Sequence, residues 1–118
     1  MAFKKYNGPD KYHFRVYKRN GHHPFVVVMI TSIKNKEGHY LLSGYMITHD
    51  FQKVLEYPSK YRKMKSNPNK NDDAPAYLCT TRFEDLKDSL FSKPYPNWHL
   101  SKEDEDFVCE LEKKKKPS

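Results

Sequence analysis

The segment His22-His23-Pro24-Phe25-Val26-Val27-Val28-Met29-Ile30 carries the densest apolar run of this sequence. A strand that alternates polar and apolar residues hides one face only, but Phe25–Ile30 has no polar residue on either face. Such a strand must be covered on both sides. We therefore expect it to lie at the centre of a closed or covered sheet.

The residues before this run form the first strand of a predicted hairpin. Between Lys11 and Arg19, aromatic or aliphatic side chains recur at every second position, which is the period of a half-buried strand. Asn20-Gly21 then favours a tight turn between two strands. A β-hairpin is therefore predicted over residues 11–34.

The residues after the apolar run add a third strand to the predicted hairpin. Residues 35–38 predict a turn, and residues 39–48 predict a third strand. Gly44 interrupts that strand, as glycine often does where a strand bends or bulges. The result is a meander of three strands with short connections.

The next part of the chain has a weaker pattern. Residues 50–75 predict a long, irregular and basic loop, because prolines punctuate them and residues 67–73 contain no apolar side chain except proline. A further strand is predicted over residues 77–83, ended by Glu84-Asp85, and a short helical or turn segment is predicted over residues 86–91.

The C-terminal part predicts a helix. Ser101-Lys102-Glu103-Asp104 has the form of a capping box, with aspartate in place of the usual Glu or Gln. Acidic residues in the first turn and lysines in the last complement the helix dipole, which predicts a helix over residues 102–115. The expected fold class is therefore mainly β with a C-terminal helix. We expect one domain over residues 1–118, with a flexible N-terminus at 1–10 and a basic tail at 113–118.

The composition narrows the class of partner. The chain has 118 residues, 36% of them hydrophobic, and a net charge of +7, which favours nucleic acid over an anionic membrane or an acidic protein. No segment approaches the ~20 apolar residues that span a bilayer, and the N-terminus lacks an apolar signal region. We therefore expect no membrane association and a cytoplasmic location. Cys79 and Cys109 permit a disulfide by arithmetic alone, but nothing in the sequence favours one.

Two histidines at strand ends define a candidate catalytic site. If the second and third strands pair antiparallel, His23 and His49 meet at one edge of the sheet, with Lys18 and Arg19 close by across the turn. Metal-independent RNA cleavage needs a base, an acid and a positive charge on the phosphate. Together with the hydroxyl of Thr48, the two histidines and the arginine meet these needs. The alternative is that they are exposed polar residues at strand ends.

The other polar residues favour an RNA-binding surface over a metal site. The six histidines are not spaced as metal ligands, so we expect no metal and no other cofactor. Tyrosines and cations mix between positions 57 and 65, which suits base stacking and phosphate neutralisation on single-stranded nucleic acid. A solvated basic loop is the alternative. The predicted RNA-binding residues are Lys18, Tyr57, Lys60, Tyr61, Arg62, Lys63 and Lys65.

Several short features occur in a familiar order: a hairpin, His23-Pro24 before a valine-rich strand, a strand ending in Ile47-Thr48, and a helix after Leu100-Ser101. In this order the chain resembles the MazF/PemK-type toxins. The resemblance implies a small SH3-like barrel that cleaves mRNA without a metal, forms a homodimer and is held inactive by an antitoxin. It also implies that Thr48 is catalytic. His23 stands where the family has an arginine, so either His23 takes the cationic role with help from Arg19, or the activity is altered or absent.

The sequence therefore predicts a toxin-like endoribonuclease acting on single-stranded RNA. The alternative is a non-catalytic basic nucleic-acid-binding module, or a small inhibitor protein of a nucleic-acid enzyme. The two hypotheses differ in the residues they require, because catalysis depends on His23 and His49, whereas binding depends on the lysines between positions 60 and 65.

Overall fold

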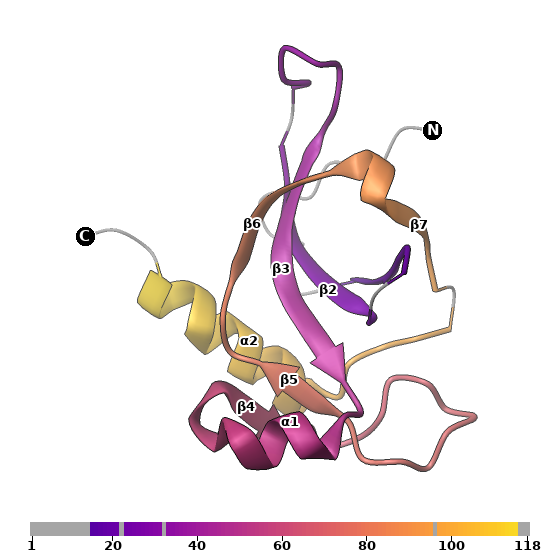
Figure 1. Ribbon diagram of the computed structural model, residues 1–118, viewed down its shortest axis with the longest axis vertical. Coiled ribbons are helices and arrows are strands. Elements are labelled where there is room, and N and C mark those ends of the chain that lie inside the picture. The colour runs from indigo at the N-terminus through magenta and orange to yellow at the C-terminus, as the bar shows by residue number, and fades with distance from the viewer. Residues whose placement is uncertain (1–14, 22, 32, 96, 116–118) are drawn as a thin grey trace.

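The computed structural model of this chain describes residues 15–21, 23–31, 33–95 and 97–115 (Figure 1). The strands are β1 (Arg15–Arg19), β2 (Phe25–Ile30), β3 (Leu41–Thr48), β4 (Tyr61–Lys63), β5 (Tyr77–Cys79), β6 (Phe83–Lys87) and β7 (Phe91–Pro94). The helices are α1 (Phe51–Glu56), α2 (Lys102–Lys115) and the short 3-10 helices η2 (Pro58–Lys60) and η3 (Asp88–Leu90). Segment 1–10, the start of the predicted first strand, His22 and the end of the basic tail lie outside the described residues.

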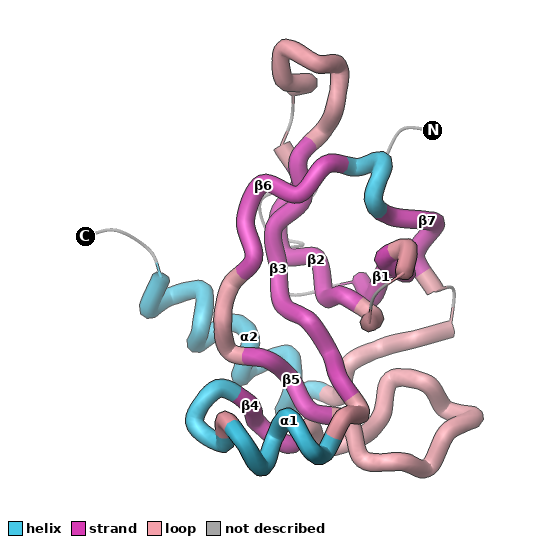
Figure 2. The backbone as a smooth tube through the Cα atoms, viewed as in Figure 1, coloured by secondary structure: helices cyan, strands magenta, loops and turns pink. Residues whose placement is uncertain are grey.

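Strand β3 is the centre of an antiparallel sheet. One edge of β3 pairs with β2, while its other edge pairs first with β6 and then with β5. On the far side of β2 lies β1, which also pairs with β7. The sheet curls from β6 through β3, β2 and β1 to β7 (Figure 2). The short helix η3 connects β6 to β7. The fold is thus mainly β with a C-terminal helix, as predicted. Its barrel-like sheet is left open, since no strand pairing among the described residues joins β6 to β7.

Strand β2 is buried on both faces, which confirms the expectation from its composition. One face contributes to an inner core inside the curled sheet, made of Tyr17, Phe25, Val27, Ile30, Leu42 and Phe91. The other face contributes to an outer core beneath α2, made of Val16, Val26, Val28, Tyr45, Ile47, Met64, Ala76, Leu78, Leu100, Val108 and Cys109. The two cores explain why this strand needs no polar face.

Gly44 lies where the backbones of β2 and β3 come very close. A Cβ at this position would lie 1.9 Å from the carbonyl oxygen of Val26 and 2.9 Å from a ring carbon of Phe25. The β2–β3 register shifts between Val27 and Met29, and the β3–β6 register shifts between Leu42 and Gly44. These irregularities confirm that the strand bends at its glycine.

Helix α2 occupies the predicted range and is tied to the sheet by polar contacts. The Tyr45 hydroxyl donates a hydrogen bond to the Glu112 carboxylate, which also accepts from Arg82 Nε at 2.8 Å. Burial, and then the contact with Glu112, raise the pKa of Tyr45 well above its ordinary value. At the other end of the helix, the Ser101 hydroxyl accepts from the Asp104 N–H at 3.1 Å, as a capping residue should.

Two sequence expectations about the middle of the chain were wrong, and a third was confirmed in part. Residues 50–75 are not irregular throughout, because they contain α1, η2 and β4. The strand expected over residues 77–83 is two strands, and β6 runs through Glu84-Asp85, where a strand end was expected. The short helical or turn segment expected over residues 86–91 is present as η3, although the end of β6 and the start of β7 occupy the rest of that range. These short strands are held by backbone pairing with distant partners, so their side chains need not show a period of two.

Two further findings concern the cysteines and the helices. Cys79 and Cys109 are both buried, and neither of them forms a disulfide. None of the helices in the described part of the chain combines the length and the apolar character needed to cross a membrane.

A partly buried contact between His39 and Asp88 holds η3 against the residues that precede β3. His39 Nδ1 lies 2.9 Å from Asp88 Oδ1, and Asp88 Oδ2 accepts from the Tyr40 N–H at 3.2 Å. Burial alone would raise the pKa of Asp88, but these hydrogen bonds outweigh it and lower the pKa below its ordinary value of 3.8. The pair therefore stabilises the connection from β6 to β7 while Asp88 is ionised.

Asp88→Asn should lower the free energy of unfolding by about 1–2 kcal/mol at neutral pH, because a charge-assisted hydrogen bond is lost. A carboxyl with a depressed folded-state pKa contributes stability above its unfolded pKa and loses it as the pH falls through the folded value. The difference between the variant and the wild type should therefore shrink at pH values below 3.8. Urea unfolding across pH measures this. Glu37→Gln, in an exposed pair with Lys87, is the control and should change little; a constant gap for Asp88→Asn down to low pH would contradict the prediction.

Gly44→Ala should lower the free energy of unfolding by about 3 kcal/mol, because the new Cβ collides with backbone atoms of β2. Gly38→Ala is the matched control, since nothing lies within 4 Å of its Cβ and it carries only the strain of a φ of +85°. That strain should cost about 1–2 kcal/mol. Equal losses in urea unfolding for both variants would contradict the close approach of β3 to β2.

Candidate functional site

Three of the predicted site residues lie at one end of the sheet, since Arg19 ends β1, His23 precedes β2 and Thr48 ends β3. Tyr17 pairs with Phe25, and Phe25 pairs with Met46, so a row of the inner core crosses the three strands shortly before that end. The Ile47 N–H donates to the Pro24 carbonyl at 2.9 Å, which keeps this pairing beyond the end of β2.

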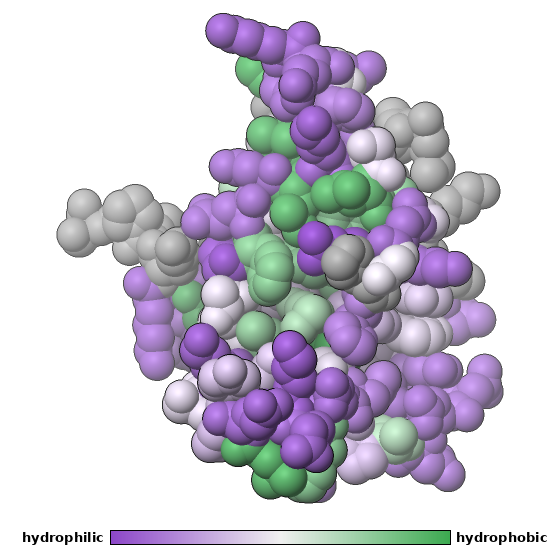
Figure 3. Space-filling model, viewed as in Figure 1, coloured by the Kyte–Doolittle hydropathy of each residue, from purple (hydrophilic) through white to green (hydrophobic). Residues whose placement is uncertain are grey.

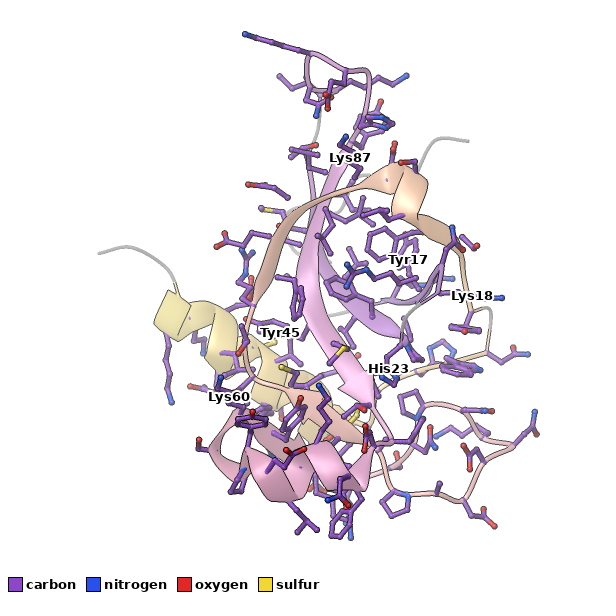
Figure 4. All side chains as sticks on the ribbon, in the orientation of Figure 1. Tyr17, Lys18, His23, Tyr45, Lys60 and Lys87 are labelled. Carbon is purple, nitrogen blue, oxygen red and sulfur yellow. The ribbon has the colours of Figure 1, made fainter. Side chains whose placement is uncertain are left out.

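His23 is exposed at this end of the sheet, directly before β2. Figure 4 shows it beside the end of β3. The sequence prediction that the start of one strand meets the end of the next is therefore confirmed. The role of His23 in catalysis stays a prediction.

His49 is half-buried immediately after β3. Its Nδ1 lies 3.1 Å from the Pro75 carbonyl oxygen. A carbonyl oxygen only accepts hydrogen bonds, so Nδ1 carries the proton and the lone pair of the neutral ring is on Nε2. This tautomer suits a general base that takes a proton through Nε2.

Thr48 has a structural role that the sequence did not predict. The residue is only 2% exposed, and its hydroxyl oxygen accepts a hydrogen bond from the Asp50 N–H at 3.0 Å. The Asp50 carboxylate in turn caps α1 by accepting from the Lys53 N–H at 3.3 Å. A buried hydroxyl is out of reach of a substrate, so this geometry does not support the catalytic role implied by the family resemblance. Thr48 instead positions His49 and the start of α1.

Arg19 and Lys18 point to different sides of β1. Arg19 lies on the inner-core side, with its guanidinium carbon 5.7 Å from the centre of the Phe83 ring. Its Nε is buried and has no hydrogen-bond partner among the described residues. Lys18 is exposed on the opposite side of the strand, and Figure 4 shows it directed away from His23. The structure therefore separates Lys18 from the other predicted site residues.

The predicted RNA-binding residues divide into two groups. Arg62 and Lys65 are engaged with α2: the Arg62 guanidinium lies 4.1 Å above the Phe107 ring, and Lys65 contacts Glu103 and, through its N–H, Asp104. The other group faces solvent, and Lys60 Nζ lies 5.4 Å from the centre of the exposed Tyr57 ring. Tyr61 is half-buried and Lys63 is exposed, both in β4.

Helix α1 connects the histidine site to this basic surface. The helix has six residues, which corresponds to a length of about 9 Å. It also presents Phe51, whose ring lies 6.0 Å from that of Tyr77. Sequence reasoning missed this aromatic pair because residues 50–75 were read as a loop. The available signal was Asp50, a favoured N-cap residue, directly before an aromatic side chain.

No group of three or more His, Cys, Asp or Glu residues in the described ranges is arranged so that it could hold a metal ion. Comparisons of the chain with protein-family models, with curated proteins and with solved structures find no match.

Thr48→Val should lower the free energy of unfolding by about 1–2 kcal/mol, because it leaves the Asp50 N–H without its acceptor at nearly unchanged side-chain volume. Thr48→Ser retains the oxygen and should lose less. Urea unfolding followed by circular dichroism measures both variants. If Val and Ser were tolerated equally, the hydroxyl would not be needed to join β3 to α1.

Proposed function

We propose that this protein is an endoribonuclease that cleaves single-stranded RNA without a metal, in the manner of the MazF/PemK-type toxins. The observation that supports the proposal is that Arg19, His23 and Thr48 lie at the same end of three paired strands, with His49 next in the chain. Two imidazoles and a guanidinium at one end of a sheet supply the proton transfers and the positive charge that phosphodiester cleavage needs.

In the proposed reaction, His49 Nε2 accepts the proton of the ribose 2′-hydroxyl. The 2′-oxygen attacks phosphorus, the bond from phosphorus to the 5′-oxygen breaks, and protonated His23 donates a proton to that leaving oxygen. The products are a 2′,3′-cyclic phosphate and a free 5′-hydroxyl. Arg19 offsets the negative charge that develops on the phosphate oxygens. Thr48 acts as a positioning residue for His49.

The cellular setting follows from this proposal. We infer a cytoplasmic location, because mRNA is a single-stranded substrate that is present there. A homodimer and an inhibitory antitoxin remain predictions from the family resemblance.

A second function, binding of nucleic acid without catalysis, is favoured by one observation. Tyr57, Lys60 and Lys63 are exposed, so they can contact nucleic acid without any contribution from the histidines. This candidate differs from the first in its response to histidine substitution.

Incubation of the protein with a long single-stranded RNA in EDTA tests the first proposal. His49→Ala and His23→Ala should each slow cleavage roughly 100- to 10,000-fold, the usual contribution of a general acid or base. Lys18→Ala is the control, because this exposed side chain lies on the opposite side of β1, and its cleavage rate should change little. Circular dichroism verifies that every variant is folded.

The chemistry of the fragment ends adds a second criterion. The wild type should leave cyclic-phosphate or 3′-phosphate ends, since the attack comes from the 2′-oxygen. RNA that stays intact in the presence of folded wild-type protein would overturn the nuclease proposal. RNA retained in a complex that Lys60→Ala weakens would then support the binding function.

A further inference from the structure

An exposed apolar surface lies directly beside the histidine site. Helix α1 starts two residues after His49 and buries none of its side chains. Phe51 is 54% exposed and Leu55 is 60% exposed, and their spacing of four residues puts them on one face of the helix. Figure 3 shows apolar atoms along the lower edge of the molecule, where Figure 1 places α1. An apolar cluster of this kind, left in water beside a candidate site, is typical of a binding surface.

The aromatic part of this surface is held in place by the sheet. The rings of Phe51 and Tyr77 lie 6.0 Å apart at an interplanar angle of 39°. Tyr77 pairs with Thr48 in the ladder between β5 and β3. The same strand end that carries His49 therefore also carries the aromatic pair. A rigid support reduces the conformational entropy that these side chains lose when a ligand binds.

The charge around the surface favours a polyanion. Three exposed cations of this segment, Lys53, Lys60 and Lys63, outnumber the two carboxylates of residues 50–65, which are Asp50 and Glu56. The other two cations of the segment, Arg62 and Lys65, contact α2. Tyr57 is 50% exposed, and the ammonium group of Lys60 lies over its ring. Aromatic rings interleaved with lysines are the usual composition of surfaces that bind single-stranded nucleic acid by stacking on bases and neutralising phosphates.

We propose that Phe51 and Tyr77 form a stacking subsite for an unpaired nucleobase, and that the strand continues along α1 to Tyr57 and Lys60. The position of this base next to the scissile phosphate rests on the function proposed above. The stacking itself does not, because it requires only the rings and the cations. The subsite makes the protein select unpaired RNA, since a base in a duplex presents no free face to a side chain.

Binding is measured separately from cleavage with a fluorescein-labelled oligouridine that carries 2′-O-methyl groups, which remove the attacking hydroxyl. Phe51→Leu keeps an apolar side chain but removes the ring, and it should weaken binding roughly ten-fold in fluorescence anisotropy. Leu55→Ala on the same face of α1 removes apolar contact but no ring, so it should weaken binding less than Phe51→Leu does. Ile33→Ala, at an exposed apolar residue between β2 and β3, is the control and should bind as the wild type does. Phe51→Trp should restore binding, and oligouridine should quench its added tryptophan fluorescence beyond that of Trp98, the only tryptophan of the chain.

The outcomes separate this inference from the proposed function. Binding that depends on Phe51, without any RNA cleavage by the wild type, would support the stacking subsite and overturn the nuclease. Cleavage that depends on His49, with equal oligouridine affinity for Phe51→Leu and the wild type, would support the nuclease and overturn the subsite. Equal losses for Leu55→Ala and Phe51→Leu would also overturn it, because they would indicate an apolar docking face for a protein partner.

Discussion

The burial of both faces of β2 is the constraint on which the rest of this structure depends. Five of its six residues are buried, and a buried apolar side chain contributes roughly 2 kcal/mol. The sum is comparable to the whole net stability of a small domain, so the fold must protect both faces. The chain curls its sheet around one face and lays α2 over the other. Gly44 makes this possible, because only a residue without Cβ lets β3 approach β2 so closely.

The same strand pairing brings the candidate site together. The pairing that aligns Tyr17, Phe25 and Met46 in the inner core also brings Arg19, His23 and Thr48 to one end of the sheet. The site is therefore supported by the best-packed part of the molecule. Only His49 needs a further contact to be oriented, and the Pro75 carbonyl supplies it.

Helix α2 changes which cations remain available for a ligand. Arg62 stacks on Phe107, and the N–H of Lys65 donates to the buried Asp104 carboxylate, so both residues help to attach the helix. The exposed aromatic and basic surface is left to α1 and to the segment that follows it. Some cations of this basic segment thus pack against α2, while others remain exposed and can attract a charged ligand. The sequence alone does not distinguish the two kinds.

Local patterns in the amino-acid sequence are sufficient to specify the hairpin, the central apolar strand, the bend at Gly44 and the helix over residues 102–115. They also predict that His23 lies beside the end of the next strand, because a short connection favours antiparallel pairing of neighbouring strands. The short strands β4, β6 and β7, the burial of Thr48 and the approach of Phe51 to Tyr77 depend instead on the tertiary structure. Each of these features is stabilised by hydrogen bonds or contacts between segments that are far apart in the sequence, and such contacts leave no periodic signal in the residues themselves.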